Sequence, residues 1–179
     1  ESGTVQNLTV EGAVVPGGSK GSVGGIAGSN RGLITGCTFQ GTVRGGSNVG
    51  GIAGVNEGTG RLIDCSVSGN VSGEHYTGGV VGQNLGSVVR CRSSAGVNAT
   101  EVKATVDLEN LDLTQLNSTE NLPSSTDIGG IAGFSAGVLQ SCQNEGTVGY
   151  PHVGYHVGGI AGRQSGYLDG CLNTGAEYG

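Results

Sequence analysis

The chain repeats one short pattern of apolar and glycine residues five times. Each copy opens with a six-residue word in which two glycines follow an apolar residue or a threonine, and a third glycine closes the word. The words are VGGIAG at Val23, VGGIAG at Val49, TGGVVG at Thr77, IGGIAG at Ile128 and VGGIAG at Val157. A cysteine follows each word, at Cys37, Cys65, Cys91, Cys142 and Cys171. The sequence is therefore a tandem repeat with a period of about 27 residues.

The apolar positions of each copy fall into three short stretches. One is centred on the glycine word, one carries an apolar residue three positions before the cysteine, and one runs through a valine six positions after it in four copies. Strands of three to five residues fit this spacing, whereas each glycine of the pairs would cost a helix about 1 kcal/mol. Stacked coils align equivalent residues about 4.8 Å apart and bury a continuous interior. The pattern predicts an all-β parallel β-helix (β-solenoid) of about six to seven coils with three short strands per coil.

The whole chain is expected to form one array without a second domain. The N-terminus reads as a half repeat with Leu8 in the cysteine slot, so the chain is expected to be a fragment of a longer protein. The expected units of the array 1–179 are a half coil at 3–22 and coils at 23–48, 49–76, 77–99, 128–156 and 157–179.

The segment 100–127 lacks both the glycine word and the cysteine. It holds six acidic residues and one lysine between Glu101 and Asp127, while the rest of the chain is nearly balanced in charge. We favour a degenerate coil with Leu111 in the cysteine slot over an insertion that leaves an uninterrupted stack, and we expect 117–126 to be a loop in both cases. Asp107, Glu109, Asn110 and Asp112 offer oxygen ligands for calcium, but a solvated acidic face is the simpler interpretation.

Composition narrows the function classes. A net charge of −6 disfavours electrostatic binding to nucleic acid or anionic lipid, and no apolar run approaches the roughly 18 residues of a membrane span. The acids of the repeats (Asp64, Glu57, Glu145, Asp169) occupy different slots, so none forms a stacked acid–base pair. We therefore expect no enzymatic activity, no cofactor and no metal site.

Two polar or thiol positions recur at fixed places and are expected to form ladders. Asn30, Asn56, Asn84, Ser135 and Gln164 share one slot, where stacked side-chain amides bond along the coil axis. The five cysteines are expected to be a reduced, buried ladder, because Leu8 fills the same slot and free cysteine behaves as a small apolar residue. One or more disulfides between neighbouring coils are the alternative.

The word VGGIAG followed by Asn-x-Gly, a cysteine and Gly-x-Val resembles the GLUG repeat of bacterial surface proteins. The resemblance extends from Val23 to Gly179 apart from the acidic segment. It implies a β-helical fold, an extracellular setting at the bacterial surface or in secreted proteins, and a non-catalytic role. Proteins of this kind include adhesin-like proteins and metallopeptidases that cleave immunoglobulin A, in which the repeats lie outside the catalytic domain.

Aromatic and histidine residues gather in the links between coils. The links contain His75, Tyr76, Tyr150, His152, Tyr155 and His156, which include all three histidines and three of the five tyrosines. Because equivalent positions of a solenoid lie along one edge, we expect these side chains on a single side, where they bind a ligand or cover exposed turns. His152 and His156 have the spacing of a zinc-peptidase pair, but Val153 replaces the glutamate and Gly154 disfavours the helix.

Two functional hypotheses follow. The first is a structural spacer of a large bacterial surface or secreted protein, whose partners are the neighbouring domains of that protein. The second is an adhesive module that binds a host glycan or protein through the Tyr/His links. Neither involves nucleic acid or insertion into a membrane.

Overall fold

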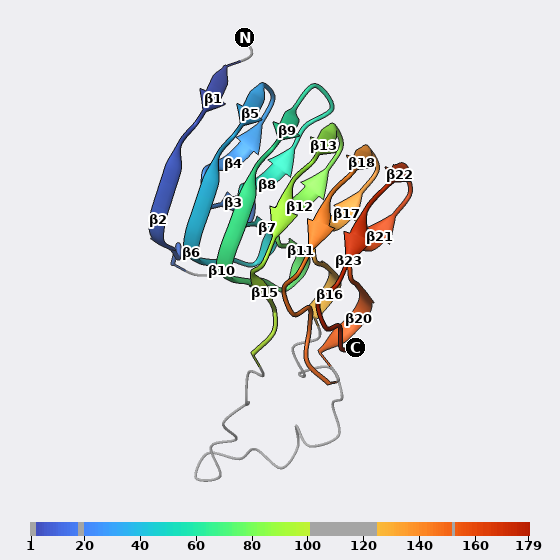
Figure 1. Cartoon of the computed structure of the whole chain (residues 1–179). Coiled ribbons are helices and arrows are strands. Elements are labelled where there is room, and N and C mark those ends of the chain that lie inside the picture. Colours follow the sequence, from blue (N-terminus) through green and yellow to red (C-terminus); the bar gives the residue numbers. More distant parts are fainter. Residues whose placement is uncertain (1–2, 18–19, 101–124, 152) are drawn as a thin grey trace.

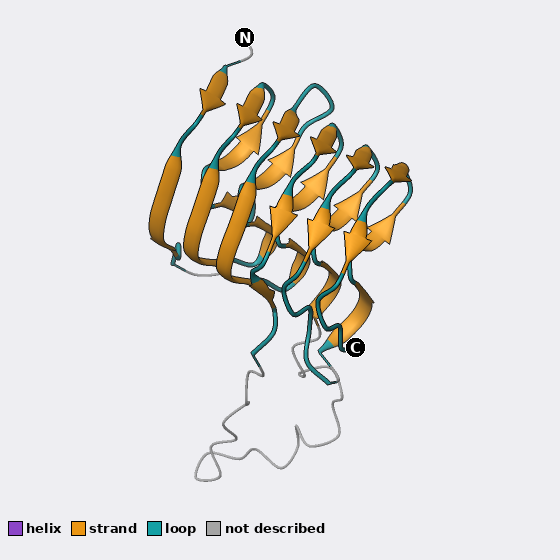
Figure 2. Cartoon of the chain, viewed as in Figure 1, coloured by secondary structure: helices purple, strands orange, loops and turns teal. Residues whose placement is uncertain are grey.

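A computed structural model of the chain describes residues 3–17, 20–100, 125–151 and 153–179. These residues form 23 strands in four parallel sheets (Figure 2). Within them no helix has the length and hydrophobicity to cross a membrane.

Each sheet collects one strand from every coil, in stacking order. Sheet A contains β1 (Thr4–Gln6), β5 (Leu33–Thr35), β9 (Arg61–Ile63), β13 (Ser87–Val89), β18 (Val138–Gln140) and β22 (Tyr167–Asp169). Sheet B contains β2 (Thr9–Val14), β6 (Thr38–Arg44), β10 (Ser66–Ser72), β14 (Arg92–Ser93), β19 (Gln143–Asn144) and β23 (Leu172–Asn173), and β15 (Gly96–Val97) also pairs with β10. Sheet C contains β3 (Val23–Gly24), β7 (Ser47–Gly50), β11 (His75–Gly78), β16 (Ser125–Gly129) and β20 (Gly154–Gly158). Sheet D contains β4 (Ala27–Asn30), β8 (Ala53–Asn56), β12 (Val81–Asn84), β17 (Ala132–Ser135) and β21 (Ala161–Gln164).

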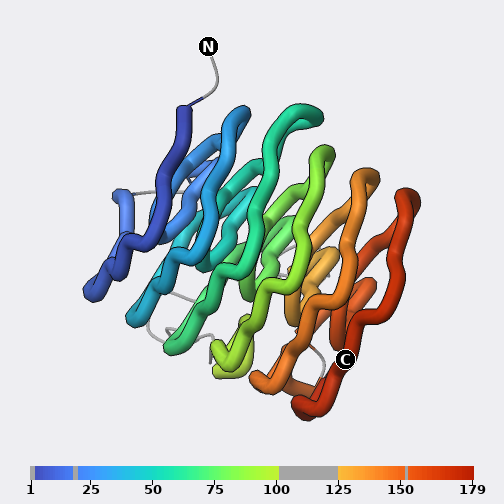
Figure 3. Tube along the Cα trace, turned by 45° about the horizontal axis from the view of Figure 1, so that its top comes forward, coloured from blue at the N-terminus to red at the C-terminus, as the bar shows by residue number. Residues whose placement is uncertain are grey.

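The predicted parallel β-solenoid is confirmed. Five full coils follow a half coil made of β1 and β2, close to the six to seven coils expected, and they lie side by side like ribs (Figures 1 and 3). We number the full coils 1 to 5: they begin at β3, β7, β11, β16 and β20.

The expected three strands per coil are wrong, because coils 1, 2, 4 and 5 have four strands each and coil 3 has five. The glycine word does not form one strand: β3 ends at Gly24 and β4 begins at Ala27, so the chain turns within the word. The reason is the close approach of sheets C and D. A Cβ atom on Gly50 would lie 2.2 Å from the Ala53 oxygen and 2.6 Å from the Val81 Cα atom, so only glycine lets the two sheets pack backbone against backbone.

The stack continues directly from coil 3 to coil 4. β11, β12, β13 and β14 pair in register with β16, β17, β18 and β19, and the two coils lie side by side in Figure 1. This pairing leaves no place for a coil between them, so the degenerate coil that we favoured is wrong. Strand β16 begins at Ser125, which also corrects the expected loop through Thr126. Leu111 and the four candidate calcium ligands lie outside the described residues.

The corner between sheets A and B turns on a single left-handed residue in every coil. The residue before the cysteine slot has φ between 52° and 59° in the half coil and in all five full coils. These residues are Asn7, Gly36, Asp64, Arg90, Ser141 and Gly170. The turn carries the following side chain into the interior, which places the cysteines of the four inner coils among the buried core residues.

The core is a set of ladders enclosed by the four sheets. Ile34, Leu62, Val88 and Leu139 form one fully buried ladder on sheet A. A smaller cluster of Val97, Ile128, Val148 and Val153 lies at the corner where sheet B leads into sheet C. Because the interior side chains of each coil stack on the equivalent side chains of the neighbouring coils, the interior is a packed core rather than a channel.

Candidate functional site

The asparagine ladder is structural, as predicted. The Asn30 side-chain amide donates to Asn56 Oδ1 over 2.8 Å, and the Asn56 amide donates to Asn84 Oδ1 over 2.9 Å. The Asn84 amide donates in turn to Ser135 Oγ over 3.2 Å, and Gln164 takes the next register position. The amides of Asn30, Asn56 and Asn84 are satisfied by one another, by Ser135 and by backbone carbonyls, so they offer nothing to a ligand, whereas Gln164 at the last coil has no hydrogen-bond partner among the described residues.

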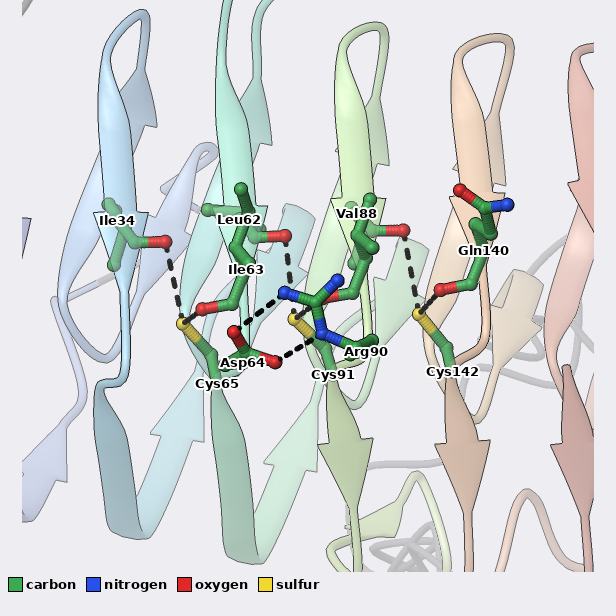
Figure 4. Close-up of polar contacts among 11 residues, drawn as sticks. Ile34, Leu62, Ile63, Asp64, Cys65, Val88, Arg90, Cys91, Gln140 and Cys142 are labelled. Carbon is green, nitrogen blue, oxygen red and sulfur yellow. Dashed lines mark hydrogen bonds and ion pairs between the residues drawn. The ribbon is translucent and has the colours of Figure 1, made fainter.

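The cysteines also form a ladder, and all five thiols are free. In Figure 4 the sulfur atoms of Cys65, Cys91 and Cys142 lie in a row, one per coil. Each thiol donates to a carbonyl of the preceding coil over 3.5–3.6 Å and to the carbonyl two residues before it over 3.3–3.5 Å. The row therefore links neighbouring coils through weak sulfur hydrogen bonds.

Thiol acidity follows from this enclosure. The interaction between the neighbouring thiols of Cys65 and Cys91, together with burial, raises the pKa of Cys91 well above its ordinary value, and the same interaction lowers the pKa of Cys65 to about 7. Burial raises the pKa of Cys142 to about 12. Because Cys65 is only 1% exposed, its lowered pKa does not make it a surface nucleophile.

The predicted Tyr/His edge is partly assembled on sheet C. His75, Thr126 and Tyr155 share one register row, and His75 Nδ1 lies 2.9 Å from Thr126 Oγ1. Tyr155 is 67% exposed. Tyr76 and His156 follow in the next row, on either side of Asp127, and all three have left-handed backbones. The structure thus brings His75, Tyr76, Tyr155 and His156 to one face.

Asp127 is the centre of this face, and its side chain is only 2% exposed. The Arg163 guanidinium donates two hydrogen bonds to this carboxylate, from Nε to Oδ1 over 2.8 Å and from Nη2 to Oδ2 over 2.7 Å. His156 Nδ1 lies 3.0 Å from Oδ1. Burial alone raises the pKa of Asp127, but the hydrogen bonds from Arg163 and Thr126 and the charge of Arg163 outweigh it, so the pKa lies below its ordinary value.

Aromatic rings cover the Arg163–Asp127 pair. The Tyr76 and Phe134 ring centroids are 5.8 Å apart, and the Arg163 guanidinium lies 5.8 Å from the first and 5.7 Å from the second. We call Tyr76, Asp127, Phe134, His156 and Arg163 the aromatic corner. It joins coils 3, 4 and 5 from outside, and cation–π contacts of this kind are worth about 0.5–1 kcal/mol at exposed sites.

Sequence reasoning missed three members of the aromatic corner. Asp127 was assigned to the solvated acidic segment, and Phe134 and Arg163 were not singled out. A signal was present, because Phe134 and Arg163 occupy the slot that holds Ser29, Val55 and Gln83 in the other coils. Aligning the copies slot by slot shows the change from small or polar residues to an aromatic ring and a cation.

Tyr150 lies apart from the sheet C face. Its side chain packs against the cluster of Val97, Ile128, Val148 and Val153 and lines a pocket of about 350 Å³ at the corner between sheets B and C. The link residues Gly73 and Glu74 line the same pocket. His152 lies outside the described residues. Four of the six predicted residues therefore share the sheet C face and Tyr150 lines the pocket, which the sequence did not reveal.

No group of three or more His, Cys, Asp or Glu side chains within the described part of the chain is arranged to hold a metal ion. The face and the pocket instead offer aromatic rings, amides, hydroxyls and single charges. Such groups bind by contact and hydrogen bonding.

The four-sheet coil with its interior ladders defines a β-solenoid repeat protein. A family model of the GLUG motif matches residues 20–44 and 45–72, which contain coils 1 and 2. The chain therefore contains a GLUG-repeat region. No curated protein and no solved structure matches the chain.

Proposed function

We propose that the chain is a non-catalytic spacer in a large bacterial surface or secreted protein, whose partners are the neighbouring domains of that protein. GLUG repeats and a β-solenoid fit a repeat module of a larger protein. The observation that carries this proposal is the register. All four sheets run through all five full coils, and the ladders fill the interior. Such a stack holds its two ends at a fixed separation, which is what a spacer needs.

A change in the number of coils tests the spacer role. Deleting residues 47–74 joins Gly46 to His75 and removes coil 2 without altering the register, because Ser47 and His75 are partners in sheet C. Duplicating the same residues adds one coil. With a reporter domain fused to each end, small-angle X-ray scattering should show the separation shorten or lengthen by about 4.8 Å per coil.

Two results would contradict the spacer. One is a separation between the reporter domains that does not follow the number of coils. The other is cleavage of a polysaccharide by the purified chain, which would replace a non-catalytic role by an enzymatic one.

An adhesive module is a second candidate, favoured by the aromatic corner and by the exposed Tyr155. Tyrosine and arginine are enriched where proteins bind partners, because they combine apolar area with hydrogen bonding. The alternative is that the aromatic corner only stabilises the stacking of coils 3 to 5. Binding of immobilised host glycans or proteins that is lost in Tyr76→Ala and Tyr155→Ala, but kept in Tyr167→Phe, would support adhesion through this face. Unchanged binding in the first two variants would exclude the face.

A further inference from the structure

A pocket of about 350 Å³ lies at the corner between sheets B and C, and described residues of four successive coils line it. Coil 1 contributes Arg44 and Gly45, and coil 2 contributes Asn70 to Glu74. Coil 3 contributes Gly96, Asn98, Ala99 and Thr100, coil 4 contributes Ser125, and the link after coil 4 contributes Tyr150. Small-molecule sites have volumes of about 300–1,000 Å³, so this one has room for one or two sugar rings.

Hydrogen bonds between coils fix the middle of the pocket. Asn98 Oδ1 accepts from the Gly73 amide over 2.9 Å, and Asn98 Nδ2 donates to the Gly73 carbonyl over 2.8 Å. Ser125 Oγ also donates to that carbonyl, over 3.3 Å. Because Asn98 is buried and holds both polar groups of one residue in the neighbouring coil, this wall is preformed.

The groups around this wall are chemically mixed. Arg44 brings a cation, Glu74 a carboxylate, Asn70 an amide and Tyr150 an aromatic ring with a hydroxyl. Arg44, Asn70 and Glu74 are exposed, and among the described residues their side chains form no ion pair or hydrogen bond. Gly96 lies opposite Asn70 in the sheet, and a Cβ there would come within 3.2 Å of Asn70 Oδ1. A glycine therefore keeps the space beside this amide open.

This chemistry suits a neutral, polyhydroxylated ligand. A saccharide offers hydroxyls that both donate and accept, which match Arg44, Glu74 and Asn70, and a C–H face that packs on a tyrosine ring. A polyanion would meet the Glu74 carboxylate and a chain of net charge −6. A purely apolar ligand would leave three polar side chains without partners.

We propose that this pocket binds a saccharide, with Arg44, Asn70 and Glu74 as hydrogen-bonding residues and Tyr150 as the aromatic platform. The proposal deepens the adhesive candidate and rests on it, but it places the binding site in the pocket rather than at the aromatic corner. The spacer role does not depend on it.

A glycan-array screen of the intact chain, followed by titration calorimetry with the saccharide that binds, tests the proposal. Arg44→Gln, Asn70→Ala and Glu74→Gln should each weaken binding about tenfold, the loss expected for one or two hydrogen bonds. The three residues are exposed, so these variants should keep the wild-type melting temperature. Arg31→Gln, an exposed arginine outside this pocket, is the matched control and should bind like wild type.

Three outcomes would overturn the pocket as a saccharide site. The first is no reproducible binding to any arrayed glycan. The second is binding that the three pocket variants leave unchanged. The third is binding lost in Tyr76→Ala and Tyr155→Ala but kept in the pocket variants, which would place adhesion on the sheet C face. The experiment that changes the number of coils tests the spacer role separately. Failure of the saccharide pocket is therefore distinguishable from failure of the spacer.

Discussion

Coils 1 and 2 and coils 3 to 5 stack in the same register but fill the same positions with different side chains. On the inner side of sheet B, coils 1 and 2 carry Phe39 and Val67, and the next three carry Ser93, Asn144 and Asn173. The register does not change between the two sets. The interior of this solenoid therefore accepts either apolar packing or polar side chains at one position, and Val67 and Ser93 are the partners at which the two meet.

The polar half works because its amides are paired. Asn144 Nδ2 donates to Asn173 Oδ1 over 2.8 Å and to the Gly146 carbonyl over 2.9 Å. A buried amide without partners costs about 1–3 kcal/mol, so these bonds are what makes asparagine tolerable in the core.

The side chains on the outer side of the stack also differ between the two sets of coils. The sheet D slot holds Ser29 and Val55 in coils 1 and 2, but Phe134 and Arg163 in coils 4 and 5. Outer positions need not match their neighbours in order to fold, so they are free to acquire aromatic and charged residues. The contrast teaches that an inner side chain must pack against or pair with its neighbours in the stack, whereas an outer side chain does not have to.

The largest expected effect separates the two phenylalanines of the chain. Phe39 is fully buried in coil 1, whereas Phe134 is half-buried on the outer face of coil 4. Phe39→Ala should lower the free energy of unfolding by about 3–5 kcal/mol, and Phe134→Ala by about 1 kcal/mol. Urea unfolding monitored by circular dichroism measures both. Equal losses of unfolding free energy would show that the buried ring and the half-buried outer ring contribute equally to stability.

Alanine in place of a glycine between sheets C and D should lower the free energy of unfolding nearly as much as Phe39→Ala does. The loss should be similar in coils 1 and 2 and in coils 3 to 5. A Cβ on Gly133 would lie 2.3 Å from the Tyr76 carbonyl carbon, and one on Gly54 would lie 2.5 Å from that of Ser22. Backbone atoms cannot move aside, so Gly133→Ala and Gly54→Ala should each cost about 3 kcal/mol. Gly58→Ala, which meets nothing within 4 Å, is the control and should leave the melting temperature nearly unchanged. A mild effect at Gly133 alone would mean that the sheets pack more loosely in coils 3 to 5.

Two bidentate arginine–aspartate pairs allow a smaller comparison. Arg163–Asp127 encloses a carboxylate that is 2% exposed, while Arg90–Asp64 lies on the surface with the Asp64 side chain 49% exposed (Figure 4). Asp127→Asn should cost about 2 kcal/mol because it leaves a buried amide facing the guanidinium. Asp64→Asn should cause no measurable loss in denaturant titrations, since exposed pairs are screened by water. A larger loss for Asp64→Asn than for Asp127→Asn would mean that the exposed pair, and not the Arg163–Asp127 pair, stabilises the stack.

The smallest effect is the pH dependence of the Asp127 pair. The pKa of Asp127 is lower in the folded chain than the unfolded value of about 3.9. Its contribution to stability is therefore complete above about pH 4 and is lost as the pH falls through the folded pKa. The difference in free energy of unfolding between wild type and Asp127→Asn should be constant from pH 7 to pH 5 and shrink below pH 4. A difference that does not change with pH would mean that the carboxylate charge is not what stabilises the corner.

The ladders could be predicted from the sequence because stacking turns repetition directly into contact. A residue such as Asn56 or Leu62 has its own equivalents as neighbours, so the copies reveal the interior without any structure. The fourth strand could not be found in this way, because Gly50 matters through a backbone contact with the next coil that leaves no apolar side chain in the pattern. The Arg163–Asp127 pair joins different slots of different coils, and slot-by-slot repetition carries no information on such a diagonal contact.

The direct pairing of coils 3 and 4 has a consequence for how such proteins change. Ser93 and Asn144 are partners in sheet B although 51 residues separate them, nearly twice the repeat. The stack therefore accepts additional sequence at a link without loss of register in any of its four sheets. The link between coils 3 and 4 is therefore the place in this chain at which a foreign peptide or a small domain can replace native sequence while the stack keeps its register.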